Sequence, residues 1–402
     1  MNITVLFLKI ISQIKIEIKM MLFIIYFIII STIILLIIDL IIIYFPKSKL
    51  VIIPQKYKIN PNEVLFEFQI INQSNNKETM VPHLDIELNG LDDGNLINLP
   101  YKKEIIIDDG MTIQNLKNYW KTTVVKSNSF IKVFFKANTR DALVENKSIW
   151  LKINWSNYGH FGFIKKQNCF LLRKNNTNYK ALKLINIPGD NNYSTIAVET
   201  EILGIFDEPV KTISNYCKDI VKKGDFLIIG ETPLAIMQGR YINPINIRYS
   251  FFAKLLCYFF HPTSSLATAC GMQILINNIG ITRIIYALII GIIFKFIGIK
   301  GIFYRLTGKE SALIDDISGT TFPYDKSIVK GPINLKRFCD DLSKRLGVDV
   351  AIADVNDLGK VKIIETSNKS NLKIIERNLT NNPAGNDDQK TPIVIIRKIK
   401  SK

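Results

Sequence analysis

Hydrophobic side chains follow three successive patterns along the chain. A continuous apolar run extends from Met20 to Phe45, alternating hydrophobic and polar positions follow to about residue 190, and short apolar runs then alternate with helical periodicities. A continuous run is typical of a membrane span, period two of a half-buried strand, and period 3.6 of an amphipathic helix. The pattern therefore predicts an α+β protein with an N-terminal transmembrane helix, a β-sandwich-like domain and a mixed α/β domain.

The apolar run has the length of a transmembrane helix. About 20 apolar residues, each rising about 1.5 Å, cross a hydrocarbon core of about 30 Å. The run exceeds the apolar region of a signal peptide, and bulky residues follow it where a cleavage site would need small ones. We expect residues 1–19 to be a basic lead and residues 20–45 a transmembrane helix, with Asp39 near enough to the interface to reach water.

Flanking charges indicate the orientation of this helix. Lysines stand on both sides, namely Lys9, Lys15 and Lys19 before the run and Lys47, Lys49, Lys56 and Lys58 after it. Cytoplasmic flanks carry the excess of positive charge, so the slight asymmetry favours a single-pass protein whose C-terminal mass is cytoplasmic. Five cysteines without the spacing of a zinc or redox motif agree with a reducing compartment.

Residues 50–190 and 195–400 differ in texture. Alternating segments such as Val64–Ile70 and Phe130–Phe135, separated by turn residues, predict an antiparallel sandwich in the first region. Helices and buried strands alternate in the second, which indicates an α/β or α+β domain. Its predicted elements are helices at Val210–Lys222 and Leu335–Leu346 and strands at Phe226–Ile229, Val348–Ile352 and Ile393–Ile396, with Asn334 capping the second helix and Gly347 ending it.

An unusually apolar insert interrupts the second domain at residues 250–306. Its densest part, Ile284–Phe294, is short for a membrane span. One crossing there would also place Gly230–Arg240 and Asp315–Asp354 on opposite sides of the membrane. We expect a helical insert that contacts the membrane or buries a dimer interface, and a second span over residues 284–299 is the alternative.

The net charge of +17 does not by itself indicate nucleic acid. Its lysines are scattered, and no basic helix or aromatic-interleaved RNA motif is present. We interpret the charge as a compositional bias that also attracts anionic lipid headgroups. The expected partners are therefore a lipid bilayer and small molecules, with no nucleic acid.

Polar residues cluster where predicted strands end. Glu231 follows one strand, and Gly239-Arg240 come shortly afterwards, where an arginine can hold phosphate or carboxylate through two hydrogen bonds. A surface ion pair is the alternative for Arg240. Asp354 and Asn356 follow another apolar strand, and ligands gather at such strand ends in open α/β sheets.

Two further stretches supply oxygen and backbone ligands. Asp315 and Asp316 are adjacent acids of the kind that binds a hard divalent cation, unless they form an ordinary turn. The loop at Gly385-Asn386 could approach a phosphate through its N–H groups, although its composition also suits an ordinary loop. The candidate metal ligands are thus Asp315, Asp316, Asp354 and Asn356.

The order of these stretches resembles the coenzyme F420-0:gamma-glutamyl ligase family, in its membrane-anchored cyanobacterial type. The resemblance covers about Thr200 to Arg397 most clearly. Its residues read GDFLIIGETPLAIMQGR, YFFHPTSSLATACGMQ, IDDISGT followed by PYD and GP, ADVNDLG, and NPAGNDDQKTPIVIIR.

The resemblance implies a homodimeric ligase that joins glutamate to a carboxylate as an amide, using GTP (or ATP) and Mn²⁺ or Mg²⁺ through an acyl phosphate. Asp315 or Asp316 and Asp354 match the family's metal-binding acids, and Gly239-Arg240 match its Gly-Arg pair. Where the family commonly has Ser-Lys, this chain has Ala235-Ile236. The alternative is therefore a non-catalytic module that keeps the fold and binds a ligand or a membrane partner.

Overall fold

The computed structural model divides the chain into two compact units, Met1–Lys47 and Ser48–Lys402. It describes residues 3–44, 48–92, 94–110, 112–116, 119–139, 148–174, 179–188, 192–262, 264–299, 301–308, 311, 313–317, 321–355, 361–385 and 389–399.

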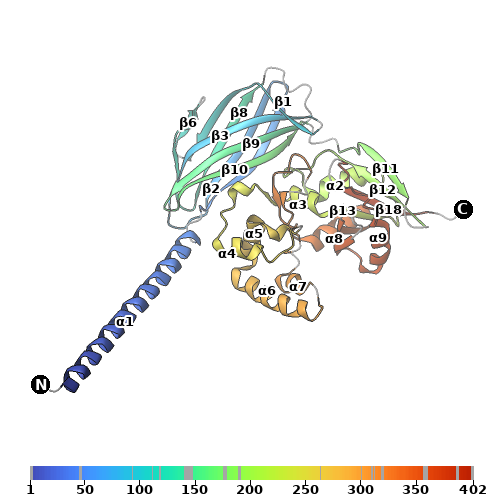
Figure 1. The fold of residues 1–402 in the computed structure, drawn as a ribbon. Coiled ribbons are helices and arrows are strands. Elements are labelled where there is room, and N and C mark those ends of the chain that lie inside the picture. The colour runs from blue at the N-terminus through green and yellow to red at the C-terminus, as the bar shows by residue number, and fades with distance from the viewer. Residues whose placement is uncertain are drawn as a thin grey trace. The chain divides into compact units, whose positions relative to one another are not determined.

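The first unit is a single helix, α1 (Ile3–Tyr44), of 42 residues (Figure 1). The predicted basic lead and apolar run are therefore one continuous helix, because neither glycine nor proline occurs before Pro46 to interrupt it. Large apolar side chains such as Phe23, Tyr26 and Phe27 are exposed along it.

Among the residues that the structure describes, no single helix combines the length and the hydropathy of a membrane span. Helices α5 (Ala269–Ile279) and α6 (Ile281–Phe296) reach that hydropathy only as a pair, across a bend of 111°.

The second unit begins with a sandwich of antiparallel strands, as the alternating pattern predicts (Figure 1). One sheet has the order β1-β2-β8-β5-β6, and the other has the order β10-β9-β3-β4 with β7 beside β3. The strands are β1 (Leu50–Asn60), β2 (Glu63–Asn72), β3 (Thr79–Asp92), β4 (Asn95–Asn98), β5 (Lys102–Asp108), β6 (Ile113–Leu116), β7 (Thr123–Val125), β8 (Ser129–Asn138), β9 (Ser148–Gly159) and β10 (Gly162–Arg173). Every second residue of β2 is buried between the sheets, which is the burial that the sequence period of two requires.

A six-stranded sheet of order β11-β12-β18-β13-β16-β17 organises the rest of the unit. Its strands are β11 (Lys183–Pro188), β12 (Tyr193–Glu199), β13 (Phe226–Gly230), β16 (Asp349–Val355), β17 (Val361–Thr366) and β18 (Ile393–Lys398), and a small β14 (Tyr241–Ile242) pairs with β15 (Ile328–Val329). Because β11 pairs with β12, the change from sandwich to mixed domain falls after Arg173, earlier than the predicted residue 190. The remaining helices are α2 (Pro209–Cys217), α3 (Glu231–Met237), α4 (Phe251–Cys257), α7 (Ile302–Thr307), α8 (Leu335–Leu346) and α9 (Leu372–Leu379).

Both faces of this sheet are covered, which explains why its central strands are apolar throughout. On β13, Leu227 and Ile229 pack with α2 and α8, whereas Phe226 and Ile228 pack with α9. Helix α8 has its predicted bounds, and Gly347 ends it. This residue has φ 69°, a left-handed backbone conformation that glycine adopts without steric strain. Asn334 precedes α8 with φ 55° and makes no side-chain cap, contrary to the prediction.

The sandwich and the mixed domain are joined by buried polar and aromatic contacts. Arg173, at the end of β10, forms an ion pair with Asp207, and these side chains are only 3% and 4% exposed. The Trp150 ring meets the Tyr324 ring edge to face at 5.1 Å, and the Tyr241 hydroxyl donates to the Cys169 carbonyl at 2.8 Å. The two domains therefore form one compact unit.

We expect Asp207→Ala to destabilise the protein by about 3–5 kcal/mol, because it leaves the buried Arg173 guanidinium without its main partner. Asp340→Ala, which removes the exposed Lys336–Asp340 pair, should cost less than about 1 kcal/mol. Urea unfolding followed by tryptophan fluorescence measures both variants. Equal losses would show that the buried pair contributes nothing special to the junction.

Candidate functional site

Two parallel strands bring their carboxyl ends to one edge of the central sheet. Strands β13 and β16 are paired in parallel, with Gly230 opposite Ala353. Glu231 therefore follows β13 at the same edge at which Asp354 lies on β16. Strand β18 is antiparallel to β13, so its beginning also lies there, and Gly230 N–H donates to the Pro392 carbonyl at 3.0 Å.

Asp315 reaches this edge from a separate loop. Its backbone forms a two-way bridge with Val329, with both N–H to O distances at 2.9 Å. Its side-chain Oδ2 accepts a hydrogen bond from the Thr232 hydroxyl at 2.7 Å, one residue beyond Glu231. The loop is thus fastened at both its backbone and its carboxylate, which orients Asp315 toward the strand ends.

The three acids line one cavity of about 450 Å³. Its walls are mainly apolar, and its polar lining comes from the three strand-end regions and the β18 loop. Besides Glu231, Asp315 and Asp354, the lining includes Thr200, Glu201, Thr232, Thr321, Asn382, Gly385, Lys390 and Thr391. Convergence of polar groups in an apolar cavity is the usual form of a small-molecule site.

Burial and mutual repulsion change the proton affinity of these acids. Burial raises the pKa of Glu231 to about 9, with further contributions from the Asp315 and Asp354 charges and a small opposing one from Lys362. Burial also raises the pKa of Asp315, against the hydrogen bond from Thr232, and the Asp354 charge adds to the increase. Strongly shifted carboxyls within one cavity are typical of functional sites.

The structure places the other predicted site residues elsewhere. Asp316 is not part of the cavity lining. Its Oδ1 accepts a hydrogen bond from the Ile317 N–H at 2.8 Å. Burial of the Cys270 thiol raises the pKa of Cys270, and the charge of Asp316 adds to that increase. Gly239 and Arg240 are also absent from the lining. Asn356 and Asn386 lie outside the described residues, while Gly385 is part of the wall.

Arg240 serves the local fold in this structure. Its guanidinium Nε donates to the Gly331 carbonyl, and its own carbonyl accepts from Lys330 N–H at 2.8 Å. Gly239 has φ 67°, and a Cβ there would come within 2.5 Å of the Ile205 side chain. Gly239 thus permits a tight turn, and Arg240 holds the segment that follows β15 through hydrogen bonds with Lys330 and Gly331.

Sequence reasoning placed Thr232 beside Glu231 at the strand end without giving it a role, and it missed Lys390. Thr232 lies within the quoted Gly224–Arg240 stretch, but only the fold shows that its hydroxyl meets Asp315. Lys390 follows the Gly385 loop and brings a cation to the wall. Lys390 could have been predicted at the cavity because it lies just before Pro392, at the start of the predicted strand Ile393–Ile396.

The donor set was compared with the needs of a divalent cation. Within the described residues, no group of three or more His, Cys, Asp or Glu side chains is arranged to hold a metal ion by itself. Mg²⁺ is usually held by one or two carboxylates together with water and substrate phosphates. Asp315 and Asp354 fit that mode, since both line the cavity and interact through their charges.

Comparison with known families identifies the sandwich. Residues 53–175 match the family described as "F420-0:gamma-glutamyl ligase, N-terminal Ig-like domain". The sandwich is Ig-like. This match supports a relationship to that ligase family, in agreement with the resemblance of residues 200–397, and no curated protein matches the chain.

Solved structures resemble the sandwich only distantly. The GAE domain of yeast GGA1 is 11% identical and covers 32% of this chain and 95% of its own, with a TM-score of 0.19. The collagen-binding subdomain of the Enterococcus faecalis surface protein ACE is 10% identical and covers 32% of this chain and 98% of its own, also at 0.19. Likenesses at these scores carry no argument about function.

The raised pKa of Glu231 predicts a stability that falls with rising pH. The folded state keeps this proton up to about pH 9, whereas an unfolded glutamate loses it near its ordinary pKa of 4.5. Between these values the folded state binds more protons, so the free energy of unfolding decreases as pH rises. Glu231→Gln should flatten this dependence and stabilise the protein at pH 8 in the absence of metal.

Urea unfolding between pH 5 and pH 9 measures this effect. Glu376→Gln, on the exposed side of α9, is the matched control and should leave the slope unchanged. An unaltered slope in Glu231→Gln would show that Glu231 is ionised in the folded protein.

Proposed function

We propose that the protein is a membrane-anchored ligase of the F420-0:gamma-glutamyl ligase type. It joins a carboxylate acceptor to L-glutamate or a similar amine, with GTP or ATP and a divalent cation. The observation that carries the proposal is the convergence of Glu231, Asp315 and Asp354 on one cavity at the strand ends. The Ig-like match of residues 53–175 supports the same assignment from a separate part of the chain.

Each cavity residue has a part in this chemistry. Asp315 and Asp354 would hold Mg²⁺ or Mn²⁺, which neutralises phosphate charge when bound. Thr232 keeps the Asp315 carboxylate in place through its 2.7 Å hydrogen bond. Lys390, which also lines the cavity, would provide a cation for a phosphate, and Gly385 (φ 62°) must lack a Cβ because the Gln389 side chain occupies that position.

Glu231 is the proton carrier of the proposal. Amide formation consumes an amine and releases its protons as the nitrogen attacks the activated carboxyl carbon and phosphate leaves. Without a cation, burial raises the pKa of Glu231 to about 9 and keeps the carboxyl protonated, whereas a divalent cation on Asp315 and Asp354 would favour the ionised carboxylate that can accept the amine proton. Its position beside the two metal-binding acids puts this proton exchange within the same cavity.

One observation favours the alternative of a non-catalytic binding module. Ala235 and Ile236 stand where the ligase family commonly has Ser-Lys, and both are buried against Trp150 and Tyr324. Ile236 also lines the cavity, so an apolar side chain replaces a cation there. Under this alternative the cavity would bind a ligand without forming a product.

A product assay separates the two functions. We expect the full chain in detergent micelles, given GTP or ATP, Mn²⁺, glutamate and a panel of carboxylates, to yield a product with the mass of the amide. Asp354→Asn should lower the rate by at least about a hundredfold, since one metal ligand is lost. Nucleotide binding without product over the whole panel would favour the non-catalytic module.

The adjacent acids Asp315 and Asp316 provide a matched pair for the cation site. Mn²⁺ with nucleotide at 100 times its Kd should stabilise the protein by about 2.7 kcal/mol. Asp315→Asn should abolish this stabilisation, whereas Asp316→Asn, outside the cavity, should retain it. Thermal unfolding with and without Mn²⁺ measures both, and equal stabilisation of the two variants would remove Asp315 from the site.

We also propose that α1 is the membrane anchor. The exposed apolar side chains of Phe23, Phe27 and their neighbours would lie in contact with lipid. The full chain should stay with membranes through alkaline carbonate extraction, whereas a chain that begins at Ser48 should be released. Release of both forms would contradict the anchor.

A further inference from the structure

The apolar insert carries positive charge without any acid. The chain has 35 aspartates and glutamates, yet none occurs between Glu231 and Glu310. Within the four helices of the insert, basic residues are interspersed with apolar ones, namely Lys254 on α4, Arg283 and Lys295 on α6, and Arg305 on α7. The segment is therefore both strongly apolar and uniformly cationic.

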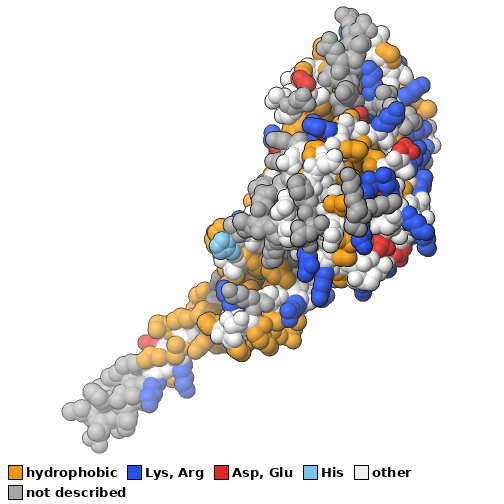
Figure 2. All heavy atoms as spheres, turned by 90° about the vertical axis from the view of Figure 1, so that its right-hand side faces the viewer, with side chains coloured by type: hydrophobic (Ala, Val, Ile, Leu, Met, Phe, Trp, Pro, Cys, Tyr) orange, Lys and Arg blue, Asp and Glu red, His pale blue; other side chains and the backbone are white. Residues whose placement is uncertain are grey.

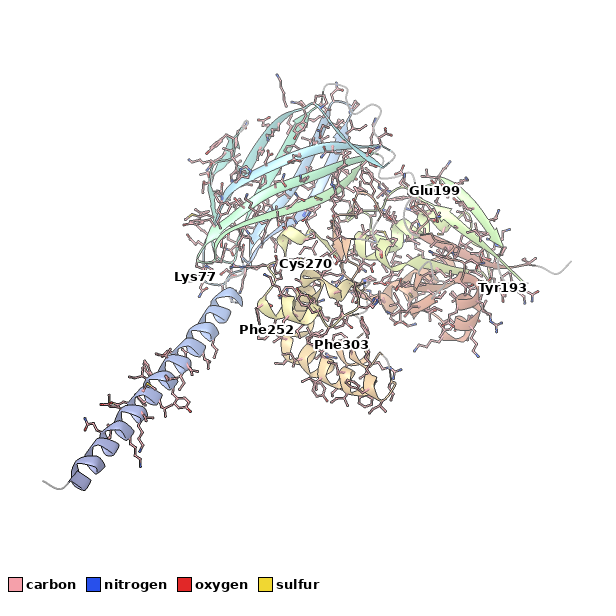
Figure 3. The ribbon with its side chains drawn as sticks, viewed as in Figure 1. Lys77, Tyr193, Glu199, Phe252, Cys270 and Phe303 are labelled. Atoms are coloured by element: carbon pink, nitrogen blue, oxygen red, sulfur yellow. The ribbon has the colours of Figure 1, made fainter. Side chains whose placement is uncertain are left out.

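The insert is a firmly folded element. Met272, Ile274 and Leu275 of α5 are buried, and Phe303 of α7 packs on the Phe260 ring at 4.8 Å. Helix α6 lies against α7 at Gly291, where a Cβ would be 3.3 Å from that of Phe303. In Figure 3, Phe252, Cys270 and Phe303 mark these helices on one side of the unit.

The outer side of α6 is unpartnered and apolar. Only Ile284 and Ala287 of this helix are buried. Exposed large side chains recur at helical spacing as Ile285, Tyr286, Ile289, Ile292, Ile293 and Phe296. Phe296 is 89% exposed, and Tyr258 at the end of α4 is 85% exposed. Exposed apolar surface of this kind marks an interaction site.

Membrane spanning does not fit this geometry. Helix α6 has 16 residues and is about 24 Å long, shorter than a hydrocarbon core of about 30 Å. Helix α5, which would have to extend the span, meets α6 at a bend of 111° and has side chains such as Met272 and Ile274 buried. The exposed face of α6 can therefore meet lipid only from the side.

We propose that α4, α6 and α7 form a docking surface that lies in the plane of an anionic lipid bilayer. The apolar side chains enter the headgroup region, and Lys254, Arg283, Lys295 and Arg305 meet lipid phosphates. Figure 2 shows one face of the molecule, on which Lys and Arg side chains are scattered among hydrophobic ones. This surface is independent of the ligase chemistry and of α1.

Charge selects lipid over a second copy of the chain. In a two-fold interface this face would meet itself, and a face without acids offers no counter-charge to its own basic residues. An anionic bilayer supplies both an apolar layer and negative charge. The docking surface would hold the cavity of the mixed domain at a fixed distance from the membrane.

Tryptophan quenching in the full chain tests the proposal. Phe296→Trp is placed on α6, and Tyr119→Trp, an equally exposed site on the sandwich, is the matched control. With phosphatidylserine vesicles, lipids brominated near the headgroup should quench the α6 tryptophan more than lipids brominated near the chain ends. The control should not be quenched by either lipid.

Charge reversal tests the choice of lipid. For the unit that begins at Ser48, Lys295→Glu should lower partitioning onto phosphatidylserine vesicles by about tenfold, whereas Lys344→Glu, exposed on α8, should not. An unquenched α6 tryptophan, including one buried in a dimer, would overturn the proposal. Stronger quenching by the chain-end lipid, or equal binding to neutral vesicles, would overturn it as well. A ligase assay in detergent remains unaffected by any of these outcomes.

Discussion

The candidate site depends on the parallel pairing of β13 with β16. Parallel neighbours end at the same edge of a sheet, so two acids more than a hundred residues apart in sequence, Glu231 and Asp354, face one cavity. The antiparallel β18 adds the beginning of its own strand, with Lys390 and Thr391, to the same edge. The long insert between β13 and β16 leaves this arrangement intact because its helices fold beside the domain.

This pairing has an electrostatic cost. Carboxyls held together in an apolar cavity repel one another and lose hydration, which is why burial and neighbouring charges raise the pKa of Glu231 to about 9. A folded chain without a cation must keep this proton, whereas a bound divalent cation would stabilise the ionised form of the neighbouring acids. The cavity is therefore better suited to a bound cation than to an empty state. Binding sites commonly reduce the stability of the protein in this way in exchange for function.

Sequence reasoning reached those parts that depend on local pattern. The alternating pattern predicted β2 and β8, and the short apolar runs predicted β13, β16 and β18. Both patterns depend only on neighbouring residues, so they indicate a strand directly. The strand-end rule also selected Glu231 and Asp354. The contact of Thr232 with Asp315, and the turn of Asp316 away from the cavity, depend on long-range packing that no local pattern records. The contact of Arg240 with Gly331, which lies 91 residues away, depends on long-range packing in the same way.

We propose different physical roles for the two apolar features of the chain, α1 and the insert. Helix α1 is long, nearly free of charge in its second half and separate from the folded unit, which are the properties of a tether. The insert consists of short helices that carry only basic charges, so their contact with lipid would fix an orientation that a tether alone cannot. A tether alone leaves the cavity free to rotate relative to the bilayer, whereas a second contact removes most of that freedom. The combination would suit an enzyme whose acceptor approaches along the membrane, because the mouth of its cavity would keep one orientation toward the lipid surface.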